Sequence, residues 1–302
     1  MQKITPHLWF DKQAREAAGF YVSLFPGSKI TSVTTLSGTP SGDCDIVSFE
    51  LAGQPFMAIS AGPLFKFNPS VSFQIKCSTK EEVDAVWGQL SPGGRVLMPL
   101  DTYPFSARYG WLDDKYGLSW QVMHVGGNSL RQKLTPVLMF VGNVRHKAEE
   151  AMNFYLSVFQ TAPDSAKAGE TKGEVLARYG VGDEPDKEGT VRYAHFSLLG
   201  QEFGAMDSPR EHKFAFNEAV SFVVTCDTQE EIDYFWGKLS ADPKAEQCGW
   251  LKDKYGLSWQ IAPTVMQEIL GGNDQGRIER ITKAFLKMKK FDIAVLQRAA
   301  AG

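Results

Sequence analysis

The feature that most constrains this chain is an internal repeat: segments of its first half return in the same order in its second half. The best preserved match is Gly110-Trp111-Leu112 through Trp120-Gln121, which returns as Gly249-Trp250-Leu251 through Trp259-Gln260. Ordered matches of this kind indicate the duplication of a unit of about 130 residues, so both copies should share one fold. The earlier matches pair Ile4-Thr5-Pro6 with Leu134-Thr135-Pro136, Phe20-Tyr21 with Phe154-Tyr155, and Val71-Ser72-Phe73 with Val220-Ser221-Phe222.

Each copy has the pattern of one strand, one helix and three strands, repeated twice. In the first helix, Phe20, Tyr21 and Leu24 recur at the spacing of one buried helix face. The second helix is predicted to begin at Thr79, because Glu82 follows at the capping-box spacing. Four such modules in one chain predict an α+β fold. The strands predicted in the first copy cover residues 8–10, 30–36, 45–51, 56–60, 71–77, 96–100, 110–112 and 118–124.

Turn-forming clusters divide the chain into two domains and a tail, at residues 1–127, 130–265 and 271–302. The first boundary falls at Gly126-Gly127-Asn128-Ser129 and the second at Gly271-Gly272-Asn273. In the tail, apolar residues recur at helical spacing, which predicts one amphipathic helix packed on the body. Its basic face is expected to be solvated or paired with acidic residues of the body. The apolar residues are Ile278, Ile281, Phe285 and Met288.

Composition narrows the choice of partners. The 302 residues carry a formal net charge of −3, which gives no electrostatic reason to expect nucleic acid. No apolar run approaches the roughly 20 residues that span a bilayer, and the N-terminus lacks a signal-peptide core, so no membrane contact and a cytoplasmic location are expected. The four cysteines form no Cys-x-x-Cys pair and are expected to be small buried residues.

Several segments resemble the PhnB-like family: Leu8-Trp9-Phe10, Phe20-Tyr21, Phe65-Lys66-Phe67-Asn68 and, most specifically, Asp114 through Gln121, which is present twice. This family belongs to the vicinal oxygen chelate (glyoxalase, bleomycin-resistance and dioxygenase) superfamily, and its members often carry the label 3-demethylubiquinone-9 3-methyltransferase. The resemblance covers about residues 3–265. It implies tandem glyoxalase-like domains, each made of two βαβββ modules that form an open cup-shaped sheet, followed here by a helical tail.

In metal-using members of the superfamily, His, Gln or Glu side chains on the first and last strands of the modules bind a divalent cation. The resemblance places His7 in a first-strand position, while Val137 occupies the same position in the second copy. Gln121 and Gln260 occupy the last-strand positions, where those relatives carry Glu. Neutral amides and a single His make an incomplete donor set for a hard or borderline cation. No catalytic metal and no other cofactor are therefore expected.

Two functions remain open from the sequence. In the first, the cup of the first domain binds a small apolar or aromatic molecule. In the second, the chain is an enzyme of glyoxalase or dioxygenase type, with His7 as metal ligand or base for a small oxygenated substrate. Residues between Val96 and Tyr109, which have no counterpart in the second copy, would then contribute to the same cup. The residues expected to bind the ligand are Trp9, Asp101, Tyr103, Trp111, Gln121 and Gln260.

A methyltransferase activity is not expected. A methyl donor such as S-adenosylmethionine usually binds a Gly-rich loop between a strand and a helix of a parallel sheet. The nearest candidate, Gly180-Val181-Gly182-Asp183, is followed by Glu-Pro-Asp-Lys, which is not a helix start of that kind. The duplication implies that modules pair within one chain, so the protein is expected to be a monomer with intrachain pairing or a homodimer.

Overall fold

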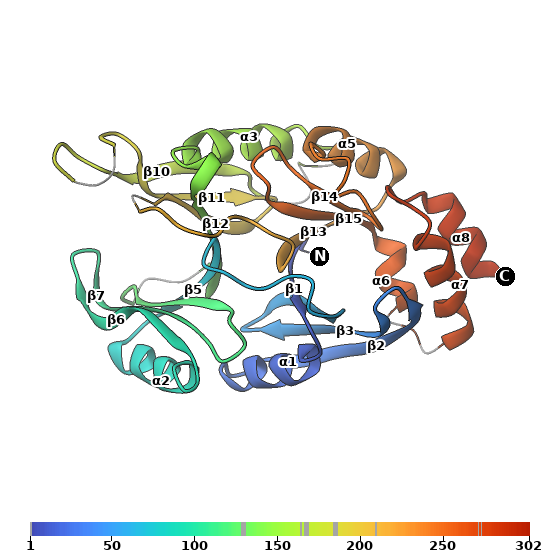
Figure 1. Cartoon of the computed structure of the whole chain (residues 1–302), viewed down its shortest axis with the longest axis horizontal. Helices are drawn as coiled ribbons and strands as arrows, with labels where there is room; N and C mark the ends of the chain where they lie inside the picture. The colour runs from blue at the N-terminus through green and yellow to red at the C-terminus, as the bar shows by residue number, and fades with distance from the viewer. Residues whose placement is uncertain are drawn as a thin grey trace.

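Two mixed β-sheets stand beside each other in the computed structural model, with helices on their outer faces (Figure 1). The structure describes residues 2–127, 131–163, 165, 169–183, 187–208, 210–270, 272 and 274–302. The first sheet has the strand order β14-β15-β13-β1-β4-β3-β2, and the second has the order β10-β11-β12-β9-β5-β8-β7-β6. The α+β fold class predicted from the sequence is thereby confirmed.

Three of the four modules show the predicted pattern, with strand bounds mostly a few residues wider, whereas in the fourth only β14 and β15 follow the helix. The third strand predicted there is wrong, because the second copy lacks the residues that form β6 in the first copy. The first sheet consists of β1 (Ile4–Phe10), β2 (Lys29–Thr39), β3 (Gly42–Leu51), β4 (Gln54–Ser60), β13 (Val220–Cys226), β14 (Trp250–Lys252) and β15 (Ser258–Pro263). The second sheet consists of β5 (Val71–Cys77), β6 (Arg95–Tyr103), β7 (Ser106–Asp113), β8 (Ser119–His124), β9 (Leu134–Phe140), β10 (Lys172–Arg178), β11 (Val191–Leu198) and β12 (Gln201–Asp207).

Each sheet combines one module from each copy. Strand β1 pairs antiparallel with β13, so that His7 lies opposite Ser221, and β5 pairs antiparallel with β9, so that Val71 lies opposite Leu138. The expectation that the two modules of one copy close a common cup is therefore wrong. The physical reason is that the ladder is formed by backbone groups, and the two copies present nearly the same edge, Val-Ser-Phe, at residues 71 and 220. The boundary at residues 128–130 lies outside the described residues.

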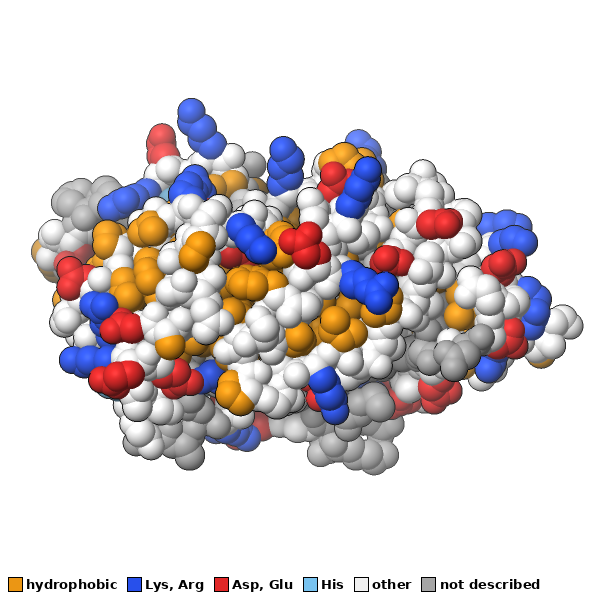
Figure 2. Space-filling view, turned by 90° about the horizontal axis from the view of Figure 1, so that it is seen from below, with side chains coloured by type: hydrophobic (Ala, Val, Ile, Leu, Met, Phe, Trp, Pro, Cys, Tyr) orange, Lys and Arg blue, Asp and Glu red, His pale blue; other side chains and the backbone are white. Residues whose placement is uncertain are grey.

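The helices cover the sheets copy by copy. Helices α1 (Ala14–Ser23) and α2 (Lys80–Leu90) of the first copy lie along one side of the molecule, and α3 (Ala148–Gln160) and α5 (Gln229–Leu239) of the second copy along the other (Figure 1). As predicted, Thr79 caps α2 by accepting a hydrogen bond from the backbone N–H of Glu82 at 3.1 Å. On the side of α1 and α2, charged side chains of both signs are interspersed with hydrophobic ones (Figure 2).

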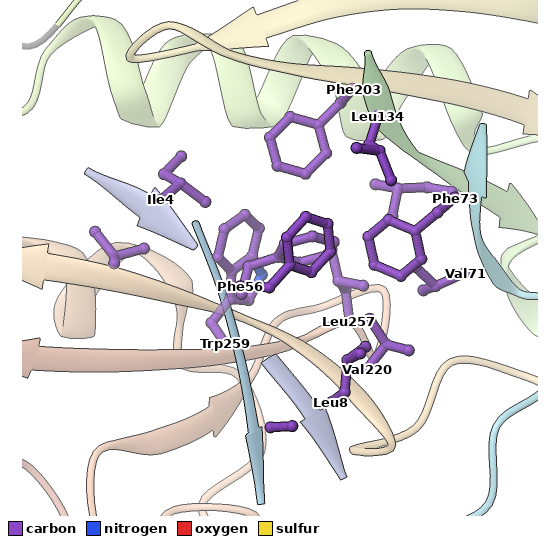
Figure 3. Close-up of a cluster of buried hydrophobic side chains, with 14 of the residues drawn as sticks. Ile4, Leu8, Phe56, Val71, Phe73, Leu134, Phe203, Val220, Leu257 and Trp259 are labelled. Carbon is purple, nitrogen blue, oxygen red and sulfur yellow. The ribbon is translucent and has the colours of Figure 1, made fainter. Parts of the chain in front are cut away.

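One hydrophobic core joins the two sheets. Phe56 of β4 packs against Phe73 of β5 with ring centroids 5.4 Å apart, although the two strands belong to different sheets. Figure 3 shows side chains from both copies converging there, which is why the alternate residues of β1, such as Ile4 and Leu8, are fully buried. Burial on this scale makes the two sheets one packed unit.

The repeated motif that carries the resemblance is a structural device. Asp114 accepts hydrogen bonds from the backbone N–H groups of Tyr116 and Leu118 and from the side chains of Tyr21 and Trp120, all at 2.8–3.1 Å. Asp114 follows a strand of the second sheet, whereas Tyr21 belongs to α1, which packs on the first sheet. The same set of bonds recurs in the second copy around Asp253. Each motif therefore ties one sheet to the helix of the other.

The tail forms two helices after α6 (Thr264–Leu270), namely α7 (Gln275–Phe285) and α8 (Ile293–Ala301). The predicted single helix is wrong beyond Phe285: Met288 lies in the connection, and its carbonyl accepts a hydrogen bond from the N–H of Cys248 at 2.8 Å. Gly271 and Asn273, where the tail was predicted to begin, lie outside the described residues. No helix in the described part of the chain is long and apolar enough to cross a membrane.

The tail is fixed to the body by specific contacts. At Gly249, an added Cβ would stand 2.4 Å from the ring of Phe291, so only glycine allows this ring to pack so close. Lys289 and Lys290 form ion pairs with Glu246 and Asp233 of the body. Helix α7 also contacts β2, so the tail spans from one edge strand of the first sheet toward the other, β14 (Figure 1).

Candidate functional site

A cavity of about 330 Å³ lies on the face of the first sheet that points away from the core, where the tail covers it. This volume is at the lower end of the range typical of small-molecule sites, roughly 300–1,000 Å³. More than half of the residues in its wall are apolar, and most of the polar ones come from β1, β2, β3 and β15. The apolar residues are Leu36, Ile46, Phe49, Pro55, Phe56, Met57, Ile59, Val223, Trp250, Ala262, Met266, Phe285 and Phe291; the others are Gln2, Thr5, His7, Thr31, Ser32, Thr34, Ser48, Glu50, Cys248 and Gln260.

Strand alternation decides which side chains reach the cavity. Along β1, Ile4 and Leu8 point into the core, so Thr5 and His7 point to the opposite face. On β15 the same rule buries Trp259 in the core and turns Gln260 toward the cavity. The amide of Gln260 donates a hydrogen bond to Ser221 Oγ at 3.0 Å. Ser221 lies opposite His7 in the ladder between β1 and β13, so this bond holds the Gln260 side chain close to His7.

His7 is the most unusual polar residue of the wall. Its side chain is almost fully buried, with 3% of the residue exposed, and its Nδ1 atom has no hydrogen-bond partner in the described structure. The ring packs edge-on against Trp250 with centroids 5.5 Å apart. Burial lowers the pKa of His7 to about 3, because no carboxylate nearby offsets the cost of a buried charge. The imidazole is therefore neutral at physiological pH.

The other residues predicted to form the site do not share this cavity. Trp9 lies nearby, with its ring 6.0 Å from that of Trp250, but its Nε1–H donates to the carbonyl of Gly62 and it does not line the cavity. Asp101, Tyr103 and Trp111 belong to β6 and β7 of the second sheet. The structure thus separates them from His7, because the modules pair across the copies.

Gln121 lies on the corresponding face of the second sheet. It accepts a hydrogen bond from Tyr109 Oη at 2.9 Å and donates one to Ser72 Oγ at 2.8 Å. The last-strand glutamine that shares a sheet and the cavity wall with His7 is therefore Gln260, from the second copy, and not Gln121. Trp111 donates to Ser119 Oγ at 2.8 Å, and Tyr103 donates to the carbonyl of Pro99 at 3.0 Å. The side chain of Asp101 accepts from the N–H of Thr102.

The corresponding face of the second sheet is filled by its own side chains. Tyr109 and Trp111 form a separate buried cluster with methionines and aromatic residues of β6, β8, β9 and β12. Tyr193 lies over Gly204, where an added Cβ would stand 2.8 Å from the Tyr193 hydroxyl. In the first sheet, the repeat places Cys248 where Tyr109 stands, and Ile46 and Met57 where Tyr193 and Gly204 stand. Cys248 is much smaller than Tyr109, which leaves the first sheet room for the cavity at this position, whereas Ile46 and Met57 together are no smaller than Tyr193 and Gly204.

The residues around His7 do not fit a divalent metal. The strand register places Met57 and Ser221 directly beside His7, and the amide of Gln260 is already bonded to Ser221. The thioether, the hydroxyl and the amide of these residues are weak ligands for a divalent cation, and a single imidazole beside them does not complete a site of glyoxalase type. Among the residues that the structure describes, no three His, Cys, Asp or Glu side chains are grouped so as to hold a metal ion.

The sequence analysis does not predict the part of the wall that α6 and the tail supply. Phe285 belongs to the predicted apolar stripe of the tail, but nothing in that stripe indicates which surface it covers. Phe291 and Met266 had no assigned role, and both line the cavity. The one available signal is Gly249: it aligns with Gly110 of the first copy and marks a position of close approach, without naming the segment that approaches.

Comparison with solved structures defines the class of fold. Glyoxalase I from Zea mays superposes with a TM-score of 0.50 at 11% identity, over 88% of this chain and 96% of that one. A variant of the same enzyme gives a TM-score of 0.51 at 12% identity, over 88% and 96%. Identities this low show the fold alone, which is that of glyoxalase I.

Within that fold, the model of the 3-demethylubiquinone-9 3-methyltransferase family matches residues 2–123 and 132–262. The chain belongs to this PhnB-like family. A PhnB protein from Bacillus cereus, described as a 3-demethylubiquinone-9 3-methyltransferase, is 42% identical over 41% of this chain and 100% of that one, with a TM-score of 0.39. A search of the curated proteins gives no match.

Proposed function

We propose that this protein binds a small, largely apolar or aromatic molecule in the cavity of the first sheet. The observation that carries the proposal is the combination of an apolar wall with the buried, unpartnered Nδ1 of His7. An unsatisfied buried polar atom costs roughly 1–3 kcal/mol. A ligand hydroxyl or amide that bonds to His7 would recover this energy, while its apolar body would fill the cavity.

Binding is favoured over catalysis by the state of His7. A general base works best when its pKa lies near the operating pH, and burial holds the pKa of His7 near 3. The described side chains around His7 also do not fit a metal ion that could activate a substrate instead. The polar residues between Val96 and Tyr109, which the enzyme hypothesis needed beside His7, belong to the second sheet.

The structure gives no support for the methyltransferase activity that the family's name describes. The Gly180–Asp183 segment lies between β10 and β11, and Asp183 accepts a hydrogen bond from the N–H of Gly180 at 2.8 Å and pairs with Arg192. It lies in the connection between two antiparallel strands, and the described residues that follow, 187–190, form a turn before β11. A nucleotide-like methyl donor usually binds at a helix N-terminus instead.

The cavity can be tested by filling it as the second sheet is filled. We expect 1-naphthol, an uncharged fluorescent probe, to bind the wild type with micromolar affinity. The variant Cys248→Tyr reproduces Tyr109 of the second sheet and should weaken binding at least tenfold, because the added ring occupies part of the cavity. Fluorescence titration measures both. Val181→Tyr adds the same ring at an exposed position and should change nothing. Equal affinity of the filled variant and the wild type would contradict the proposal.

The role of His7 is tested separately with a ligand pair. His7→Val introduces the residue that the second copy carries at the matching position. It should weaken the binding of 1-naphthol about tenfold, because one hydrogen bond to a buried group is lost. The methyl ether 1-methoxynaphthalene cannot donate a hydrogen bond and should bind the variant and the wild type alike. If both probes lose the same affinity, His7 contributes packing alone.

A further inference from the structure

The charges around the cavity are unevenly distributed. Three lining residues are ionisable: His7 on β1, Glu50 on β3, and Cys248 just before β14. No Lys or Arg occurs among the described lining residues, including those that the tail supplies. Glu50 forms an ion pair with Lys29 of β2, whose Nζ lies 3.5 Å from Glu50 Oε2 and which is itself largely exposed.

None of the three ionisable groups supplies a positive charge near neutral pH. His7 is neutral because burial lowers its pKa to about 3, and burial raises the pKa of the Cys248 thiol, which keeps it protonated. Glu50 is the remaining group, and its carboxylate is paired with Lys29 at the solvent side. The cavity therefore offers hydrogen-bonding groups but no counter-charge for an anion.

We propose that this cavity selects the uncharged form of a hydroxyl-bearing ligand and excludes the corresponding anion. The proposal rests on the proposed function and names its ligand class: neutral phenols and alcohols, rather than carboxylates, phosphates or phenolates. Moving an anion from water into an apolar wall without a cation costs several kcal/mol. A neutral hydroxyl avoids this cost and can still bond to His7.

The pH dependence of one probe tests the proposal in the wild-type protein. The hydroxyl of 4-nitrophenol ionises near neutral pH, whereas 4-nitroanisole has no proton to lose. Calorimetric titrations on both sides of the ionisation should show the affinity for 4-nitrophenol falling about tenfold per pH unit once the phenolate forms. The affinity for 4-nitroanisole should stay constant. A phenolate that binds as tightly as the phenol would overturn the proposal.

A single cation placed in the wall should abolish the preference for the uncharged phenol. Met57 lies beside His7, and Lys has nearly the same length as Met. In Met57→Lys, the affinity for 4-nitrophenol should no longer fall as the phenolate forms. Met57→Leu changes the same position without adding charge and should keep the wild-type pH dependence. If both variants behave alike, the missing counter-charge is not the cause of the selectivity and the proposal fails.

The two proposals fail in different ways. If neither 4-nitrophenol nor 4-nitroanisole binds at any pH, no small molecule of this class enters the cavity, and the proposed function itself is contradicted. If both bind at every pH with constant affinity, the cavity binds ligands but does not discriminate charge. Only the selectivity proposal is then wrong.

Discussion

Replacing Asp253 by Ala is expected to lower the free energy of unfolding by about 3–5 kcal/mol, as for other buried polar networks that lose a central member. Asp253 is 3% exposed and accepts four hydrogen bonds. Removing it leaves the Tyr155 hydroxyl, the Trp259 indole N–H and two backbone N–H groups buried without an acceptor. Urea denaturation at pH 8 measures the loss.

The position of Asp253 makes the effect larger than the local bonds alone suggest. It lies between β14 and β15 of the first sheet, while Tyr155 belongs to α3, which packs on the second sheet. The loss therefore loosens the contact between the sheets as well as the turn. Asp114 holds the equivalent position in the first copy, so Asp114→Ala should cost a similar amount.

Two matched variants distinguish the loss of the Asp253 hydrogen bonds from the general effect of removing a charge on stability. Tyr155→Phe removes one of the four donors and should cost about 1 kcal/mol. Asp43→Ala removes an exposed carboxylate and should stay within about 0.5 kcal/mol of the wild type. A loss below 1 kcal/mol for Asp253→Ala would mean that the repeated motif does not hold the sheets together.

Local structure could be predicted from the sequence wherever it depends on local pattern. The helix face of Phe20 and Tyr21, the cap at Thr79 and the strand segments follow from periodicity and side-chain chemistry. The pairing of modules does not, because β1 could form the same backbone ladder with Val71-Ser72-Phe73 or with Val220-Ser221-Phe222. Which of these two strands pairs with β1 depends on how the connecting segments run, and the side-chain pattern does not predict their course.

The same ambiguity explains the predicted site. His7 and Gln260 were both identified, and they do line one cavity. Gln121, Asp101 and Tyr103 were assigned to the cup of His7 because they belong to the same copy. Once the copies exchange modules, those residues face a different sheet. The size of Tyr109 against Cys248 favours an open first sheet, but only a known register makes that comparison possible.

The second large effect is expected in acid. The pKa of His7 is about 3 in the folded protein, whereas an imidazole in the unfolded chain titrates near 6.5. Between these values the unfolded chain binds a proton that the folded protein excludes, so the free energy of unfolding falls as the pH falls. Each pH unit is worth about 1.4 kcal/mol, so lowering the pH from 7 to 4.5 should remove about 2–3 kcal/mol through this residue.

His7→Val isolates this contribution, because Val cannot titrate and the second copy carries Val at the matching position. Other groups titrate over the same range: burial raises the pKa of Asp253 to about 6, so that carboxyl favours the folded protein as the pH falls. Asp253 is present in both proteins and cancels from the difference between them. Urea denaturation from pH 7 to 4.5 should show the wild type losing about 2–3 kcal/mol more than His7→Val. Parallel curves would mean that His7 takes up its proton in the folded protein, and the neutral imidazole on which charge selection depends would then be absent below pH 6.5.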